Sequence, residues 1–342
     1  MLGKKRFGCV RVRVRPSRPC TRIPSPAEPL RRGRGGGRPG TQGARKRARK
    51  RGKGGGWPLA DVRPAGTEAA IPSGPGGPVE AVLFDLDGTL LELDMDRFLP
   101  VYLRRLAAWV ADLFDPEDFV RQLIRATTAV MENRDRSRTN AALLYETLWA
   151  GLDPARHPGA RPDRREQALV RFERFYREEF PKLQFMARRR PEAAALVEAA
   201  RARGWKVVLA TNPIFPMAAI AERLRWAGLD VGQFDLVTVL ENMHSCKPQP
   251  DYYLEVADRI GVEPGRCLMV GNDLRQDIAP ARAVGMAVYV AEGLVLHEGE
   301  PGAVDAPRGT LGQLLQWIVK SDGNRNTFAN RPTLPGNNAP LE

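Results

Sequence analysis

The stretch AVLFDLDGTLLEL, residues 81–93, decides the fold that the sequence predicts. Four apolar or small residues, 81–84, run straight into Asp85 and Asp87, which Gly88 follows. Carboxylates at the end of a buried strand are unfavourable unless a positive charge is held beside them. The pattern therefore predicts a strand whose carboxyl end forms part of a charged site.

Downstream of this stretch, short apolar runs alternate with helical patterns. Strands are expected at 206–210, 235–240, 267–270 and 287–291. Helices are expected at 191–203, 216–227, 250–260 and 276–284. Strands separated by helices predict an α/β fold with a doubly wound parallel sheet, Rossmann-like in its layering.

Between the first two strands lies a long section of helical character. In residues 96–114 the apolar side chains recur at helical spacing and form one stripe. Further helices are expected at 116–132, 140–150 and 163–179. We therefore expect an all-helical, lid-like cap domain at 95–185, inserted into an α/β core made of 79–94 and 186–319.

The charge of the chain is distributed unevenly. The formal net charge is +13, yet residues 1–78 alone carry 20 Lys and Arg against 3 Asp and Glu, so the remainder is mildly acidic. The first 78 residues also contain 16 Gly and 11 Pro, and show neither helical nor strand periodicity. Such a composition predicts a disordered N-terminus, and a frayed tail is expected at 320–342.

Three interpretations of the basic tail remain open from the sequence. It could act on nucleic acid or another polyanion by neutralising phosphates. It could serve no specific purpose, as an upstream stretch translated from a misplaced start with Val79 as the initiator. It could be a transit peptide, although its Pro and Gly content opposes the amphipathic helix that such peptides need.

The compartment is indicated by cysteine usage and hydropathy. The four cysteines, at 9, 20, 246 and 267, show no CxxC spacing. No apolar run approaches the ~18 residues that a membrane span requires. We therefore expect a cytoplasmic protein without a disulfide framework, a zinc site or a membrane partner.

Polar side chains follow each strand of the expected sheet. Ligands of parallel α/β sheets bind beyond the carboxyl ends of the strands. Four loops at this edge would supply these residues: Asp85, Asp87 and Thr89; Thr211 and Asn212; Lys247; Asn272, Asp273 and Asp277.

These four loops resemble the motifs of the haloacid dehalogenase (HAD) superfamily. VLFDLDGTL is similar to the first motif, VVLATN to the second, CKPQPDYY to the third and VGNDLRQDIAPARAVGM to the fourth. The resemblance covers about 79–295, and 95–185 is similar to the helical cap that many members insert. It implies a phosphatase-type hydrolase that uses Mg2+.

The resemblance also implies roles for individual residues. Asp85 would be the nucleophile that forms an aspartyl-phosphate, and Asp87 would act as general acid and then general base. Thr211, Asn212 and Lys247 would bind the phosphoryl group. The metal would be held by Asp85, the backbone carbonyl of Asp87, Asp273 and Asp277.

The fourth motif departs from the family pattern. Many members have Gly-Asp at its start, whereas this chain has Gly271-Asn272-Asp273. Either Asn272 takes the ligand position and the site loses a charge, or Asp273 takes it. We favour Asp273, because its spacing to Asp277 resembles a known variant of the motif.

Structural roles compete with these functional ones. Asp277 could simply cap the helix it precedes, and Thr211-Asn212-Pro213 could cap the next helix while also binding phosphate. No two histidines lie at metal-ligand spacing, so His157, His244 and His297 are interpreted as structural or surface residues.

The sequence therefore predicts a Mg2+-dependent phosphohydrolase that acts on a small phosphorylated metabolite. A phosphomutase or another phosphotransferase on the same fold is the alternative within this class. A protein that acts on nucleic acid through its basic tail is the alternative outside it. Neither the substrate nor the oligomeric state can be read from the sequence.

Overall fold

The computed structural model describes residues 78–299 and 306–320. Six strands form one parallel sheet in the order β5-β4-β1-β6-β7-β8. Their bounds are Ala81–Phe84 (β1), Lys206–Leu209 (β4), Leu236–Val237 (β5), Cys267–Gly271 (β6), Ala287–Ala291 (β7) and Arg308–Gly309 (β8). The doubly wound parallel sheet predicted from the sequence is thus confirmed.

The two faces of this sheet are buried in separate apolar clusters, because successive side chains of a strand point to opposite faces. In β1, Val82 and Phe84 join the cluster that includes residues of α5 (Glu192–Ala202), α6 (Met217–Ala227) and α9 (Leu311–Lys320). Ala81 and Leu83 join the cluster that includes residues of α7 (Pro250–Ile260) and α8 (Ala279–Ala283). With both faces covered, only the strand ends are left to carry a site.

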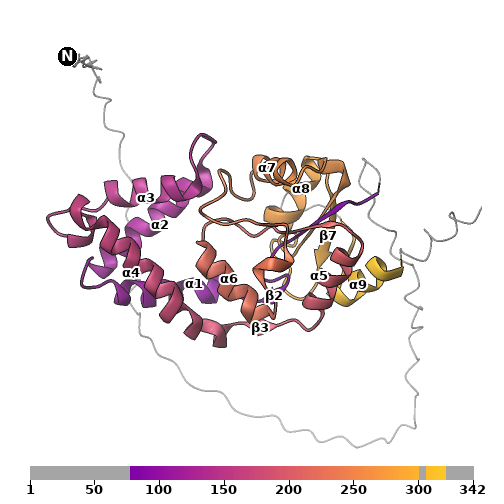
Figure 1. The fold of residues 1–342 in the computed structure, drawn as a ribbon, viewed down its shortest axis with the longest axis horizontal. Helices are drawn as coiled ribbons and strands as arrows, with labels where there is room; N and C mark the ends of the chain where they lie inside the picture. The colour runs from indigo at the N-terminus through magenta and orange to yellow at the C-terminus, as the bar shows by residue number, and fades with distance from the viewer. Residues whose placement is uncertain (1–77, 300–305, 321–342) are drawn as a thin grey trace, which may run out of the picture. The chain divides into compact units, whose positions relative to one another are not determined.

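A helical section separates β1 from β4, as predicted. It contains α1 (Met95–Trp109), α2 (Pro116–Glu132), α3 (Asn140–Ala150) and α4 (Arg165–Glu178). The section lies between β2 (Leu91–Glu92) and β3 (Arg188–Arg189), which pair antiparallel. Figure 1 shows these four helices gathered apart from the sheet. We call α1–α4 the cap.

Three cap helices begin at side chains that satisfy free backbone N–H groups. Asp94, Asp115 and Thr139 accept from the first turns of α1, α2 and α3 respectively. The predicted bounds of α2 and α3 agree with the structure. Helix α1 ends at Trp109, earlier than the expected 114.

Several elements differ from the expectation. The predicted helix 276–284 is instead a π-helical turn, Leu274–Ile278, followed by the short helix α8. The short strand pair β2–β3, the edge strand β8 and helix α9 were not predicted. The interpretations of residues 1–77 and 321–342 lie outside the described residues.

Candidate active site

The carboxyl ends of β1, β4 and β6 meet at one edge of the sheet. Because β1 and β6 pair in register, Phe84 lies beside Val270, and the N–H of Asp85 donates to the Val270 carbonyl at 2.9 Å. The next residues along each strand, Asp85 and Gly271, therefore leave the sheet together. This brings the first and fourth motifs side by side although almost 200 residues separate them.

Lys247 is the centre of the charge arrangement at this edge. Its Nζ donates to Oδ1 of Asp85 at 2.8 Å and to Oδ1 of Asp277 at 2.6 Å. The side chain is only 2% exposed, so water cannot replace either contact. Burial alone would lower the pKa of Lys247, but the two carboxylates raise it well above its usual value. Lys247 therefore stays protonated and balances the carboxylates of two motifs.

Asp87 lies near Asp85 but has a different partner. Its Oδ2 accepts from Nη1 of Arg223, a residue of α6 that is fully buried. Oδ1 of Asp87 is also buried and has no hydrogen-bond partner in the described part of the chain. Burial raises the pKa of Asp87, Arg223 acts against the rise, and Asp85 adds to it. A carboxyl group that readily holds a proton suits the general acid predicted at this position.

Gly88 allows the first motif to turn closely against the fourth. Its φ is +89°, and a Cβ there would lie 2.4 Å from Nδ2 of Asn272. Asn272 is fixed in this position by two hydrogen bonds: its Oδ1 accepts from Thr89 at 3.0 Å, and its Nδ2 donates to the Leu294 carbonyl at 2.6 Å. The side chain of Asn272 therefore links the loops after β1, β6 and β7.

Asp273 and Asp277 are held by the π-helical turn. Three donors converge on Oδ1 of Asp273: the N–H groups of Arg275 and Gln276, at 2.8 and 2.9 Å, and Nδ1 of His297, at 2.8 Å. Oδ2 of Asp277 accepts the N–H of Asp273 at 3.0 Å, while its Oδ1 accepts from Lys247. The wider π turn is a geometry often found at functional sites, and here it turns Asp277 toward the sheet edge.

The second motif contributes a rigid turn after β4. The carbonyl of Thr211 accepts hydrogen bonds from Thr238 at 2.8 Å and from Tyr252 at 2.9 Å. Asn212 donates to Gln276 at 3.3 Å, and its Oδ1 is buried without a partner in the described residues. An unpaired buried amide oxygen beside the fourth motif suits a group that completes its hydrogen bonding on a ligand.

Carboxylate and carbonyl oxygens are the ligand types that Mg2+ prefers. Asp85 and Asp273 leave adjacent strand ends, so the donor set at this edge fits a magnesium ion in kind. Among residues 78–299 and 306–320, however, no three carboxylate, His or Cys side chains are gathered at metal-binding distance. Both oxygens of Asp277 are already occupied, by Lys247 and by the N–H of Asp273.

The structure also places residues at this edge that sequence reasoning missed. Arg223 lies in a helix whose pattern gives no sign that a basic side chain is buried there. His297, interpreted as structural or surface, contacts Asp273. Arg190 donates to the carbonyls of Gly88 at 3.0 Å and Glu292 at 2.9 Å. No local sequence signal marks these three residues, because each acts on a partner distant in the chain.

Comparison with known proteins identifies the family. Residues 79–285 match the family model described as haloacid dehalogenase-like hydrolase. The chain belongs to this family. The resemblance to this superfamily is thereby confirmed.

Curated relatives of this HAD-family chain are phosphatases. A phosphoglycolate phosphatase of Escherichia coli is 30% identical over 222 residues, covering 60% of this chain and 79% of that enzyme. A phosphoserine phosphatase of Thermus thermophilus is 28% identical over 239 residues, covering 63% and 90%. The chain is thus a phosphatase-type hydrolase of the HAD family.

A solved structure is also similar to the chain. A HAD phosphatase from Thermococcus onnurineus is 21% identical, covers 70% of this chain and 98% of its own, and superposes with a TM-score of 0.43. Within the described residues, no helix is both long enough and apolar enough to cross a membrane.

Proposed function

We propose that the protein hydrolyses a small phosphorylated metabolite in a Mg2+-dependent reaction, with Asp85 as the nucleophile. The observation that carries this proposal is the buried Lys247, which bonds Asp85 and Asp277 at once. Phosphoryl transfer needs positioning and charge neutralisation more than strong covalent chemistry, and Lys247 supplies both.

The proposed first step begins with a phosphate ester bound above the ends of β1 and β4. A carboxylate oxygen of Asp85 attacks phosphorus, and the bond from phosphorus to the ester oxygen breaks. The leaving oxygen takes a proton from Asp87 and departs as an alcohol. Lys247, Thr211 and Asn212 hold the phosphoryl oxygens during this transfer.

The second step releases phosphate. Asp87, now ionised, takes a proton from water, and the water oxygen attacks phosphorus of the aspartyl-phosphate. The bond between phosphorus and Asp85 breaks, which frees inorganic phosphate and restores both carboxyl groups to their starting states. Arg223 holds Asp87 through Oδ2, so the carboxyl group has a defined place between the two proton transfers.

The magnesium ion would be held by Asp85, the backbone carbonyl of Asp87 and Asp273. When bound, it supplies positive charge to the phosphoryl oxygens. We assign Asp277 chiefly to holding Lys247, because neither of its oxygens is free of a protein donor. The side chain of Asn272 links three loops, which favours Asp273 in the ligand position.

The substrate class is proposed from the relatives. Two of them are named for phosphoglycolate and phosphoserine, which are small phosphorylated acids. We propose a substrate of similar size, with a single phosphate ester.

The test is phosphate release from para-nitrophenyl phosphate and from a panel of small phosphate esters, with Mg2+ and with EDTA. We expect Mg2+-dependent release, and a loss of at least roughly a thousandfold in Asp85→Asn, because the nucleophile is removed. Asp163→Asn, an exposed carboxylate of the cap region, is the matched control and should keep full activity. Full release by Asp85→Asn would overturn the mechanism.

The metal assignment is tested by the Mg2+ concentration at half-maximal activity. Asp273→Asn should raise this concentration by about tenfold or more, because the ligand loses its negative charge. Asp277→Asn should lower turnover through Lys247 with a smaller shift in Mg2+ demand. If Asp277→Asn raised the Mg2+ concentration at half-maximal activity more than Asp273→Asn did, the ligand position would belong to Asp277.

A further inference from the structure

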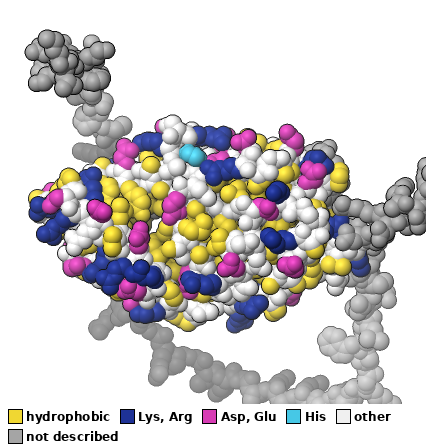
Figure 2. All heavy atoms as spheres, viewed as in Figure 1, with side chains coloured by type: hydrophobic (Ala, Val, Ile, Leu, Met, Phe, Trp, Pro, Cys, Tyr) yellow, Lys and Arg dark blue, Asp and Glu magenta, His cyan; other side chains and the backbone are white. Residues whose placement is uncertain are grey.

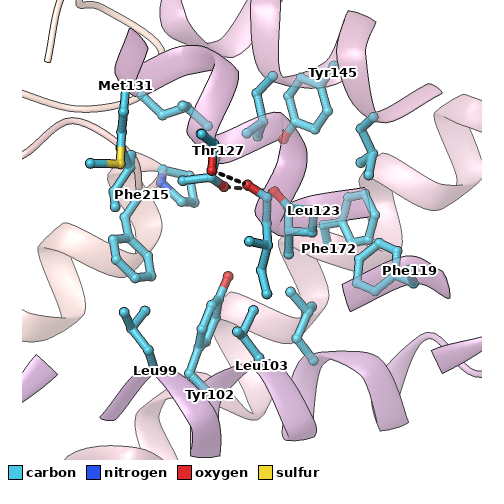
Figure 3. Close-up of a pocket in the computed structure, with 18 of the residues that line it drawn as sticks. Leu99, Tyr102, Leu103, Phe119, Leu123, Thr127, Met131, Tyr145, Phe172 and Phe215 are labelled. Atoms are coloured by element: carbon cyan, nitrogen blue, oxygen red, sulfur yellow. Dashed lines mark hydrogen bonds between the residues drawn. The ribbon is translucent and has the colours of Figure 1, made fainter. Parts of the chain in front are cut away.

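A second feature of the molecule lies in the cap, away from the charged edge. The helices α1–α4 and the loop after β4 enclose a cavity of about 260 Å³ (Figure 3). Its lining is mostly aliphatic and aromatic, and every cap helix contributes to it. A concave apolar space of this size between four helices has the character of a ligand pocket.

The cavity is large enough for an organic molecule. An apolar cavity of about 150 Å³ suffices to bind benzene. The space here is larger, and ligand pockets are typically lined by hydrophobic and aromatic side chains with a few polar groups. Its volume and lining therefore match a ligand of about two fused rings, or an alkyl group of similar bulk.

The polar groups of the cavity are phenols. The hydroxyl groups of Tyr102 and Tyr176 are 2.7 Å apart, so whichever donates, the other retains a proton to offer. Tyr145 also lines the space, and its hydroxyl forms no hydrogen bond with the described residues. In Figure 3 the oxygen of Tyr102 points into the middle of the cavity. Burial raises the pKa of Tyr102 and that of Tyr145 to about 12, so both remain hydrogen-bond donors at neutral pH.

The cavity can be reached from solvent. Of its lining residues, Ile124 is 50% exposed and Thr128 is exposed as well. Figure 2 shows apolar side chains gathered on the viewed face over the cap helices, with charged side chains around them.

A wall separates this cavity from the catalytic edge. The ring of Phe215 lines the cavity, with its centroid 5.3 Å from that of Tyr102. The guanidinium carbon of Arg223 lies 4.4 Å from the centroid of the same ring, and Arg223 binds Asp87. Phe215 and Arg223 are both buried, and the cavity lining includes neither of the catalytic carboxylates nor Lys247.

We infer that the cap cavity binds an apolar small molecule, an aromatic ring system or short alkyl group bearing one hydrogen-bond acceptor, at a site distinct from the phosphoryl site. The acceptor would take a hydrogen bond from the phenols, and the apolar body would fill the space between the helices. This site goes beyond the proposed phosphatase activity and does not depend on it.

The test is calorimetric titration of the full chain with 2-naphthol, whose two rings and single oxygen match the cavity. We expect saturable one-to-one binding with a negative heat-capacity change, which is the mark of apolar burial. Inorganic phosphate with Mg2+, which occupies the other site, should leave the affinity unchanged. Absence of saturable heat would overturn the proposal, and so would displacement of the naphthol by phosphate.

Two filled-cavity variants locate the binding site. Leu123→Trp on α2 and Leu103→Trp on α1 add bulk from different walls, and each should weaken binding about tenfold or more. Val170→Trp, on the exposed face of α4 and outside the cavity, is the matched control and should bind as the parent does. If both filled variants bind normally, the ligand lies elsewhere.

The hydrogen bond between the ligand and the phenols can be tested separately. Tyr145→Phe should weaken 2-naphthol several-fold but leave naphthalene unchanged, because only the alcohol uses the hydroxyl. Equal losses for both ligands would contradict the hydrogen-bonding part of the inference. Failure of phosphate release in the enzyme assays would leave all these binding measurements intact, so the two proposals fail separately.

Discussion

Removing Lys247 should destabilise the fold strongly, quite apart from its effect on turnover. The Lys247→Met variant deletes the cation that bonds Asp85 and Asp277, at 2.8 and 2.6 Å. At an effective dielectric constant of about 20, each contact corresponds to ~6 kcal/mol of Coulomb attraction. Desolvation of three ions offsets most of this, so the net cost of truncation should be about 3–5 kcal/mol, as for other broken buried pairs.

The unfolding free energy lost in Lys247→Met should be partly recovered by also removing the charge of Asp277. Burial raises the pKa of Asp277 to about 7 even with Lys247 beside it, so without the lysine this carboxyl group is poorly tolerated as an anion. The double variant Lys247→Met, Asp277→Asn leaves Asp85 as the one carboxylate of this trio. We expect its unfolding free energy to exceed that of Lys247→Met by about 1–3 kcal/mol, a non-additive result typical of contacting residues.

The measurement is urea unfolding at pH 7 without Mg2+, followed by circular dichroism and tryptophan fluorescence. Lys206→Met is the matched control, because Lys206 is half exposed and pairs with Asp235 at 3.1 Å on the surface. Lys206→Met should lose at most about 1 kcal/mol of unfolding free energy. The reasoning is refuted if Lys247→Met costs no more than Lys206→Met, or if the double variant loses the sum of the two single losses.

Three further changes test the site and its surroundings. Arg223→Met should cost about 3 kcal/mol of unfolding free energy and Arg223→Lys clearly less in the same urea assay, because the methionine leaves a buried carboxylate unpaired. Gly88→Ala should lower both stability and phosphate release, since φ is +89° and the new Cβ would meet Asn272; an unaffected variant would mean that the loops separate easily. Cys246 and Cys267 are buried, and burial raises the pKa of each thiol to about 12. Iodoacetamide at pH 8 should therefore leave both thiols unmodified in the folded chain and modify both in urea. Peptide mass spectrometry measures the modification.

Much of the fold could be predicted because local sequence and tertiary structure agree. The bounds of β1 and β7 follow from uninterrupted apolar runs, and those of α2, α3 and α7 from start signals with helical spacing. The location of the site at one edge of the sheet was predicted from a single rule, that ligands bind at the carboxyl ends of parallel strands. On that basis Asp85 and Lys247 could be assigned to one site across 162 residues.

Other elements could not be predicted because they depend on distant partners. Strand β5 is only two residues long, although a strand was predicted over 235–240, because within this range Leu236 and Val237 are the residues that pair with β4. The π turn at Leu274–Ile278 arises where the chain accommodates Asp273 and Asp277 together, and helical periodicity does not distinguish it from a regular turn. Local pattern therefore predicts that an element exists more reliably than it predicts its exact form.

Arg223 shows most clearly where sequence reasoning reaches its limit. In AERLRWAGL, residues 221–229, two arginines two positions apart look alike, yet Arg225 has a side chain that is 66% exposed while Arg223 is fully buried against Asp87. The difference depends on which side of α6 faces the first motif and Phe215, and that is settled only when the sheet is assembled. Arg223 touches both the proposed general acid and Phe215, a residue that lines the cap cavity. Because the two sites are proposed to be independent, 2-naphthol should leave phosphate release unchanged, and a change in release on adding it would contradict that independence.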